Sequence, residues 1–159
     1  MSLKLKSPAF ETGGPIPPEY TSDGENVSPP LNWSDPPRGT RSFALIVDDP
    51  DARDPAKPER TWVHWVLYNL PPAQTRLPRH TTAQSLPRGA HEGINDWQKP
   101  GWRGPSPPRG RHRYFHKIYA LDVELPELGH ADKATVERAM EGHVLATAEL
   151  VGTYEHRGV

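Results

Sequence analysis

The chain has 159 residues, a formal net charge of −1 at pH 7 and no cysteine. This balance gives no general attraction to nucleic acid or anionic membranes, and the missing cysteines exclude a disulfide framework and thiolate catalysis. No apolar stretch reaches the ~18 residues that a membrane span needs, and no secretory signal is visible. We therefore expect a cytoplasmic protein, without a nucleic-acid partner, in which residues 1–159 form a single domain.

Prolines and glycines divide the chain into structured runs. The 20 prolines and 13 glycines cluster between segments rich in aromatic and β-branched residues, as they do in turns and loops. Their combined content stays below the ~25–30% that is typical of low-complexity disorder. Five tryptophans also argue against disorder.

Three runs have the pattern of strands. Residues 41–48 are mostly apolar and are bounded by Pro-Arg-Gly and Asp-Pro, which predicts a buried strand. Residues 61–70 are aromatic and β-branched and stop at a proline pair, and residues 112–124 alternate between polar and apolar side chains. Weaker strand patterns occur at residues 31–33 and 89–94.

A single helical pattern lies near the end of the chain. Asp132 can cap a helix, and apolar residues recur every four positions over residues 136–148, with Gly142 as a break and Gly152 as the stop. Strands that come first and a helix that comes last predict a mainly β (α+β) fold. We expect an antiparallel-rich sheet with a peripheral C-terminal helix.

Polar side chains suited to binding a ligand fall at related places on these strands. His112 and Tyr114 share one face of the third strand, and Trp62 and His64 share one face of the second. Asp49 follows the first strand, at the kind of position where ligands meet a rigid scaffold. If the second and third strands lie near each other, these five side chains line one pocket.

This set of side chains suits a small anion. Imidazolium groups and a tyrosine hydroxyl donate hydrogen bonds, and Pro-Gly loops expose backbone N–H groups. Because a carboxylate repels an anion, we expect Asp49 to accept a hydrogen bond from a histidine ring and to favour its charged form. The alternative is a small hydrolase or lyase with Asp49 and His64 as the acid–base pair, although the chain has no Gly-x-Ser-x-Gly elbow and no evident nucleophile.

Other interpretations of the same residues stay open. His112 and His116 would lie roughly 13 Å apart on a strand, too far for one zinc ion with ligands at ~2.0–2.1 Å, so we expect no metal and no cofactor. The arginines at 103, 109, 111 and 113 form either a solvated loop or a rim that attracts phosphorylated ligands. In a purely structural interpretation, Asp49 caps a turn and His64 is a satisfied core residue.

In their order along the chain, these motifs resemble those of the phosphatidylethanolamine-binding proteins, in particular the prokaryotic Raf-kinase-inhibitor-like branch. The resemblance extends over residues 7–154. The pieces that carry it include Ser7-Pro-Ala-Phe10, Asn26-Val-Ser-Pro-Pro-Leu31, Asp48-Asp-Pro-Asp-Ala52, Trp62-Val-His-Trp65 and Gly101-Trp-Arg-Gly-Pro-Ser-Pro-Pro-Arg-Gly-Arg-His-Arg-Tyr114.

The resemblance implies a large central sheet packed on a smaller sheet, and a pocket for phosphate-like anions and phospholipid head groups. The ligand-binding positions that it implies are Asp49, Trp62, His64, Pro108, His112 and Tyr114. It also implies a modulator of a kinase or protease rather than an enzyme, and a homodimer. Arg53 stands where the family usually has proline, and we expect a trans Ala52–Arg53 peptide, because a cis bond before a non-proline residue costs about 2.5–4 kcal/mol.

Overall fold

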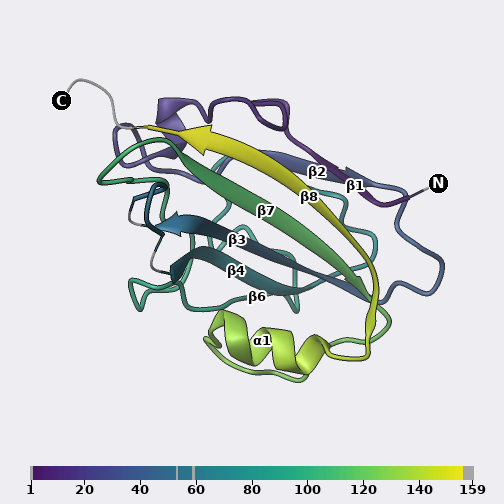
Figure 1. Cartoon of the computed structure of the whole chain (residues 1–159). Coiled ribbons are helices and arrows are strands. Elements are labelled where there is room, and N and C mark those ends of the chain that lie inside the picture. The colour runs from purple at the N-terminus through teal and green to yellow at the C-terminus, as the bar shows by residue number, and fades with distance from the viewer. Residues whose placement is uncertain (1, 53, 59, 156–159) are drawn as a thin grey trace.

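The computed structural model describes residues 2–52, 54–58 and 60–155 (Figure 1). Within them, five strands form one antiparallel sheet in the order β6-β4-β3-β7-β8. The strands are β3 (Ser42–Ala52), β4 (Arg60–Leu70), β6 (His91–Glu92), β7 (His112–Leu121) and β8 (Val144–Tyr154). The Ala52–Arg53 peptide lies outside the described residues.

A smaller antiparallel sheet packs on one face of the large one. It has the order β1-β2-β5, and its strands are β1 (Lys4–Lys6), β2 (Leu31–Ser34) and β5 (Arg76–Leu77). The core between the sheets is apolar and aromatic, and Trp33 of β2 meets Phe43 of β3 with ring centroids 5.6 Å apart. A short 3-10 helix, η1 (Pro18–Tyr20), precedes β2. The predicted mainly β fold with two sheets is confirmed.

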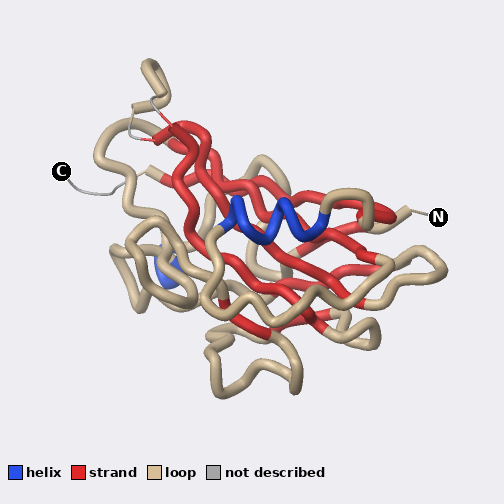
Figure 2. Tube along the Cα trace, turned by 90° about the horizontal axis from the view of Figure 1, so that it is seen from below, coloured by secondary structure: helices blue, strands red, loops and turns tan. Residues whose placement is uncertain are grey.

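The helix α1 (Lys133–Met140) lies across the other face of the large sheet (Figure 2). Its N-cap is Asp132, whose side chain accepts a hydrogen bond from the Thr135 N–H at 2.9 Å. Val136 and Met140 belong to a second apolar cluster that includes Ile46 and Val66 of the sheet. No helix in the described residues is long and apolar enough to span a membrane.

The predicted continuation of this helix beyond residue 140 is wrong. Gly142 has φ = +80°, which ends the helix, and β8 then pairs with β7 along its length. Residues four apart share a face on a strand as well as on a helix, so the spacing from Val136 to Ala148 did not separate the two structures. The helix is therefore peripheral, but the last element is a strand.

The other strand predictions differ from the structure mainly at their ends. The first strand runs past Asp48 to Ala52, with an irregular register against β4 over its last residues. The third strand ends at Leu121 instead of residue 124. The strands β1 and β5 were not predicted, because two or three residues are too few to show an alternating pattern.

Candidate functional site

The six predicted site residues surround one hollow of about 180 Å³. It lies at the end of the large sheet where β3 finishes and β4 and β7 begin. The residues that line it are Asp49, Ala52, Trp62, His64, Trp97, Ser106, Pro107, Pro108, His112 and Tyr114. Trp97 was not predicted, although a tryptophan between the polar turn residues Asp96 and Gln98 is itself a signal of a loop held against the protein surface.

The strand order explains why distant motifs meet here. Because β3 lies between β4 and β7, the end of β3 brings Asp49 between His64 on one neighbour and His112 on the other. The rings of His64 and Tyr114 are in edge-to-face contact, with centroids 5.2 Å apart. The rings of His112 and Tyr114 are stacked at 6.3 Å.

His112 lies between two hydrogen-bond acceptors. Its Nδ1 is 2.6 Å from Oδ2 of Asp49, and its Nε2 is 2.7 Å from the carbonyl oxygen of Arg109. A neutral imidazole carries one N–H, whereas both contacts require a donor. The geometry therefore fits a doubly protonated, positively charged His112, whose two ring protons are already used within the protein.

This arrangement agrees with the expectation that Asp49 accepts a hydrogen bond from a histidine ring, and it assigns that ring to His112. It does not contain the Asp49–His64 acid–base pair of the hydrolase alternative. It also changes the expected source of hydrogen bonds for a ligand. His112 supplies positive charge beside the hollow, and the free hydrogen-bonding atoms belong to other residues.

His64 has one ring nitrogen left for a ligand. Its Nδ1 lies 2.6 Å from the carbonyl oxygen of Arg103 and must donate to it, whereas Nε2 has no hydrogen bond with a described residue. Burial lowers the pKa of the His64 ring, and the Arg103 carbonyl and the charge of Asp49 only partly oppose this effect. In the empty pocket near neutral pH, Nε2 of His64 is therefore an unprotonated acceptor.

Tyr114 offers a hydroxyl group of fixed protonation. Its side chain is buried, and the hydroxyl makes no hydrogen bond with a described residue. Burial raises the pKa of this hydroxyl, and the nearby charge of Asp49 raises it further. Tyr114 is therefore a permanent donor next to a histidine that can change its protonation state.

Asp51, two residues after Asp49, helps to hold the Asp49 carboxylate in place. Asp51 accepts from the backbone N–H and the Nε of Arg113 at 2.9 Å each, and its second oxygen accepts from Nη2 of Arg113 at 2.9 Å. These side-chain hydrogen bonds lower the pKa of Asp51 in spite of its burial. The N–H of Asp51 donates to Oδ1 of Asp49 at 2.7 Å, so the brace also orients the carboxylate that binds His112.

Two tryptophans in contact with each other form the aromatic wall of the hollow. The rings of Trp62 and Trp97 are in edge-to-face contact at 5.5 Å, and Trp97 also contacts His64 at 5.0 Å. Arg60 lies over Trp62 at 4.8 Å and Arg103 lies over Trp97 at 5.0 Å. The wall therefore carries a guanidinium group on each tryptophan.

The four arginines of the predicted basic cluster have different roles in the structure. Arg103 stacks on Trp97, Arg113 binds Asp51, and the backbone carbonyl of Arg109 binds His112. Arg111 lies 3.8 Å from Glu155 at an exposed position. They do not form one continuous rim, and only Arg103 is held on the pocket wall by its side chain.

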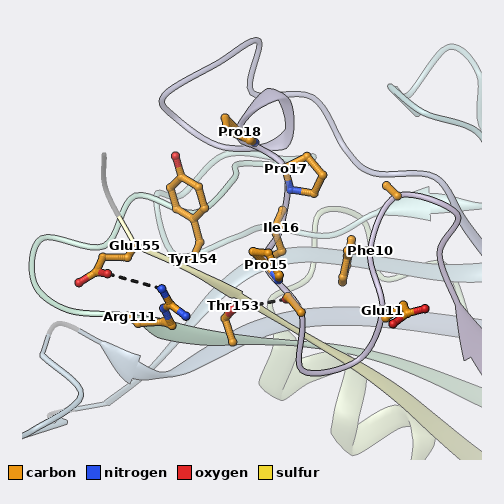
Figure 3. A pocket seen from close by; sticks show the side chains of 12 residues that line it. Phe10, Glu11, Pro15, Ile16, Pro17, Pro18, Arg111, Thr153, Tyr154 and Glu155 are labelled. Carbon is orange, nitrogen blue, oxygen red and sulfur yellow. Dashed lines mark hydrogen bonds and ion pairs between the residues drawn. The ribbon is translucent and has the colours of Figure 1, made fainter. Parts of the chain in front are cut away.

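A larger hollow of about 650 Å³ lies beside the end of β8 (Figure 3). It is lined mainly by residues 9–18, including three prolines, and the pair of Arg111 and Glu155 closes one end. Its described lining contains no histidine and no buried carboxylate. The chemistry therefore favours the smaller hollow as the functional site.

No group of three or more His, Asp or Glu side chains is placed to hold a metal ion in the described part of the chain.

A two-sheet β fold with a small pocket at one end of the sheet, lined by both polar and aromatic side chains, defines a binding protein of one recognisable class. The family model described as phosphatidylethanolamine-binding protein matches residues 6–155, and the chain belongs to this family. The resemblance found in the sequence is thereby confirmed.

Relatives of similar length come from archaea and bacteria. A UPF0098 protein of Methanothermobacter thermautotrophicus is 49% identical over 153 residues, which cover 96% of this chain and 98% of the relative. The structure of CT736, a putative phosphatidylethanolamine-binding protein homologue from Chlamydia trachomatis, is similar with a TM-score of 0.89 at 41% identity, covering 98% of each chain. The structure of E. coli YbcL, described as a new member of the mammalian family, also has a TM-score of 0.89, at 33% identity, and covers 99% of this chain and 100% of its own.

Proposed function

We propose that the chain is a binding module whose small hollow takes a phosphate-type anion, either a phosphate monoester or a phospholipid head group. The observation that carries the proposal is the bonding of His112 to two acceptors, Asp49 and the Arg109 carbonyl. This bonding keeps a positive charge beside a hollow in which Nε2 of His64 and the hydroxyl of Tyr114 make no hydrogen bond with a described residue. Family membership supports a binding role of this kind.

The size of the hollow sets the size of the group that enters. Sites for drug-sized ligands measure about 300–1,000 Å³, and this hollow has about 180 Å³. A phosphate group with a short substituent fits that volume. The remainder of a larger ligand would lie outside, next to the Trp62–Trp97 wall and the guanidinium groups of Arg60 and Arg103.

Binding of an anion requires a proton at His64. Nε2 of the neutral ring presents a lone pair, which repels a phosphate oxygen but accepts a proton from a phosphate hydroxyl or from solvent. Once charged, the ring donates to the anion, and Tyr114 donates to another oxygen. A nearby opposite charge favours the charged imidazole, so the ligand itself raises the proton affinity that burial lowers.

We also propose that the chain is not an enzyme and acts on a partner kinase or protease, as family resemblance implies. For hydrolysis, Ser106 is the serine that lines the hollow, but no hydrogen bond joins it to His64 or His112 in the described part of the chain. A nucleophile beside its base is the arrangement such chemistry needs. The pairing of Asp49 with His112 further leaves His64 without the carboxylate that the hydrolase alternative assigned to it.

Calorimetric titration with inorganic phosphate and with phosphoethanolamine tests the proposal, with ethanolamine as the ligand that lacks the anion. Both phosphates should bind and ethanolamine should not. Tyr114→Phe should weaken binding roughly tenfold or more, because a hydrogen bond to a charged group contributes ~1.5–3 kcal/mol. Tyr119→Phe is the matched control, since Tyr119 lies on the same strand but on the opposite face. Equal affinity in both variants would contradict the assignment.

A further inference from the structure

The aromatic wall of the hollow already carries positive charge. Trp62 and Trp97 both line the hollow. The guanidinium carbon of Arg60 lies 4.8 Å from the ring centre of Trp62, and that of Arg103 lies 5.0 Å from the ring centre of Trp97. A ligand cation is attracted to the face of a tryptophan ring, but on this wall it would come close to a guanidinium group. The wall therefore disfavours a positively charged substituent on the ligand.

The carboxylates of the site are also bound to cations. Three ion pairs show this: Asp49 with His112 at 2.6 Å, Asp51 with Arg113 at 2.9 Å, and Asp96 with Arg60 at 3.2 Å. A carboxylate that already holds a cation attracts a second one only weakly, because the two charges of the pair largely cancel. Among the described residues that line the hollow, Asp49 is the one carboxylate, and it is paired. An ammonium group would therefore find no unpaired carboxylate at the hollow.

Arg103 differs from Arg60 because its charge is not shared. Arg60 pairs with Asp96, whereas Arg103 forms no ion pair with a described residue. The backbone of Arg103 is fixed against the pocket histidine. Its carbonyl oxygen lies 2.6 Å from Nδ1 of His64, and its N–H donates to the His64 carbonyl at 3.3 Å. The ring of Trp97 contacts both groups, since it lies 5.0 Å from the His64 ring. One indole ring therefore links the guanidinium to the histidine that faces the hollow.

We propose that Arg103 makes the site selective for phosphate esters whose substituent carries a second negative charge, such as a carboxylate. This selectivity rests on the proposed function, because the phosphate itself is held in the hollow and the substituent lies outside it, next to Trp97. There an anionic substituent meets the guanidinium of Arg103, a neutral one gains no attraction, and an ammonium group is repelled. The ethanolamine ester of phosphate is then a weaker ligand than an ester of the same size with a carboxylate.

Three phosphate esters with two-carbon substituents test this order. Phosphoglycolate carries a carboxylate, ethyl phosphate has no charge on its substituent, and phosphoethanolamine carries an ammonium group. Calorimetric titration at neutral pH measures each affinity relative to that of inorganic phosphate, which has no substituent. We expect phosphoglycolate to bind more tightly than ethyl phosphate, and ethyl phosphate more tightly than phosphoethanolamine. Each step should be roughly threefold, within the range that exposed ion pairs contribute, and added salt should reduce it.

Two substitutions of Arg103 separate its charge from its place in the loop. Arg103→Gln should bring the three relative affinities together, whereas Arg103→Lys keeps the charge and should keep their order. Arg38→Gln is the matched control. It removes an exposed arginine from the loop just before β3 begins, whereas the hollow lies where β3 ends. This variant has the same net charge as Arg103→Gln, and its relative affinities should equal those of the wild type.

The reference ligand distinguishes the two ways of failing. If inorganic phosphate does not bind to the wild type, the proposed function is wrong and the selectivity is wrong with it. If inorganic phosphate binds and the three esters have equal relative affinities, the selectivity alone is overturned. An order of affinities that persists in Arg103→Gln, or that changes equally in Arg38→Gln, overturns the assignment to Arg103.

The anionic ester can belong to a small molecule or to a lipid head group, and vesicles separate the two sources. Cosedimentation uses vesicles of phosphatidylcholine that contain either a phosphatidylinositol monophosphate or phosphatidylethanolamine. Cosedimentation with the inositol lipid alone supports the proposal and identifies a lipid head group. Cosedimentation with neither, while the order of the soluble esters holds, supports the proposal and identifies a soluble ester. Preferential cosedimentation with phosphatidylethanolamine overturns the proposal.

Discussion

Nδ1 of His112 donates to Oδ2 of Asp49 at 2.6 Å, and the two side chains are only 1% and 5% exposed. A buried pair of this kind costs much to break, because the remaining partner keeps an uncompensated charge away from water. Its main consequence here is positional. The pair joins the end of β3 to the start of β7 and fixes the charge beside the hollow.

We expect Asp49→Asn to lower the free energy of unfolding by roughly 3–5 kcal/mol, the range for removing one partner of a buried pair. The exposed pair of His143 and Asp122, with a distance of 2.9 Å, is a matched control. Asp122→Asn should cost less than about 1 kcal/mol. Urea unfolding at neutral pH measures both variants, and similar losses in the two would show that the Asp49 pair has no special role.

His116 should make the protein less stable in mild acid. Burial lowers the pKa of its ring to about 4, below the ~6.5 of an exposed histidine. Between these two pH values the unfolded chain binds more protons at this histidine than the folded chain does. The free energy of unfolding is therefore unaffected by His116 above about pH 6.5. Below that pH it falls by roughly 1.4 kcal/mol per pH unit. His116→Phe should remove this contribution, which the difference between variant and wild-type unfolding curves at about pH 7.5 and about pH 5 isolates from other groups. A difference that does not change with pH would contradict the assignment.

Phosphate should bind more tightly as the pH falls. The pKa of His64 is lowered by burial in the empty pocket, and the bound anion favours the charged ring, so binding takes up a proton. Titrations in buffers of different ionisation enthalpy measure that uptake directly. Affinity should be higher at about pH 5.5 than at about pH 8, on either side of the unperturbed value of ~6.5. His64→Gln should bind with much less pH dependence, and an unchanged dependence in this variant would assign the proton to another group.

Gly104 should tolerate no side chain. A Cβ atom at this position would lie 2.2 Å from the carbonyl oxygen of Tyr20 and 2.7 Å from Oδ1 of Asn26, which accepts from the Gly104 N–H at 2.8 Å. We expect Gly104→Ala to cost ~1–3 kcal/mol, as overpacking does, and to weaken phosphate binding by moving the pocket wall. Asn26→Ala frees the same loop without adding volume. Asn26→Ala should weaken phosphate binding with a smaller loss of stability. If both variants bind phosphate with the affinity of the wild type, the position of this loop does not affect the site.

The long strands and the site residues could be predicted because their signals are local. Alternation along β7 assigned His112 and Tyr114 to one face, and proline pairs marked where strands end. The contact between Asp49 and His112 could not be predicted in this way. Strand phase assigns a face, but the distance between two side chains depends on the irregular register at the end of β3.

Two other misses have the same physical origin. A four-residue spacing from Val136 to Ala148 fits a helix and a strand equally, and pairing with a strand more than twenty residues earlier in the chain decided the outcome. Trp97 reaches the pocket because Asp96 of the same loop accepts from the Val63 N–H at 2.7 Å. Long-range bonds of this kind leave no periodic pattern in the sequence.

The loop of residues 101–111 holds both histidines of the pocket through its own backbone. The carbonyl of Arg103 binds His64, and the carbonyl of Arg109 binds His112. A proton gained by His64 would strengthen the first of these bonds. If the hollow takes a phosphate as proposed, the loop would therefore couple occupancy of the hollow to the strength of one of its own backbone contacts. A partner that contacts the loop would then bind the filled and the empty form with different strength.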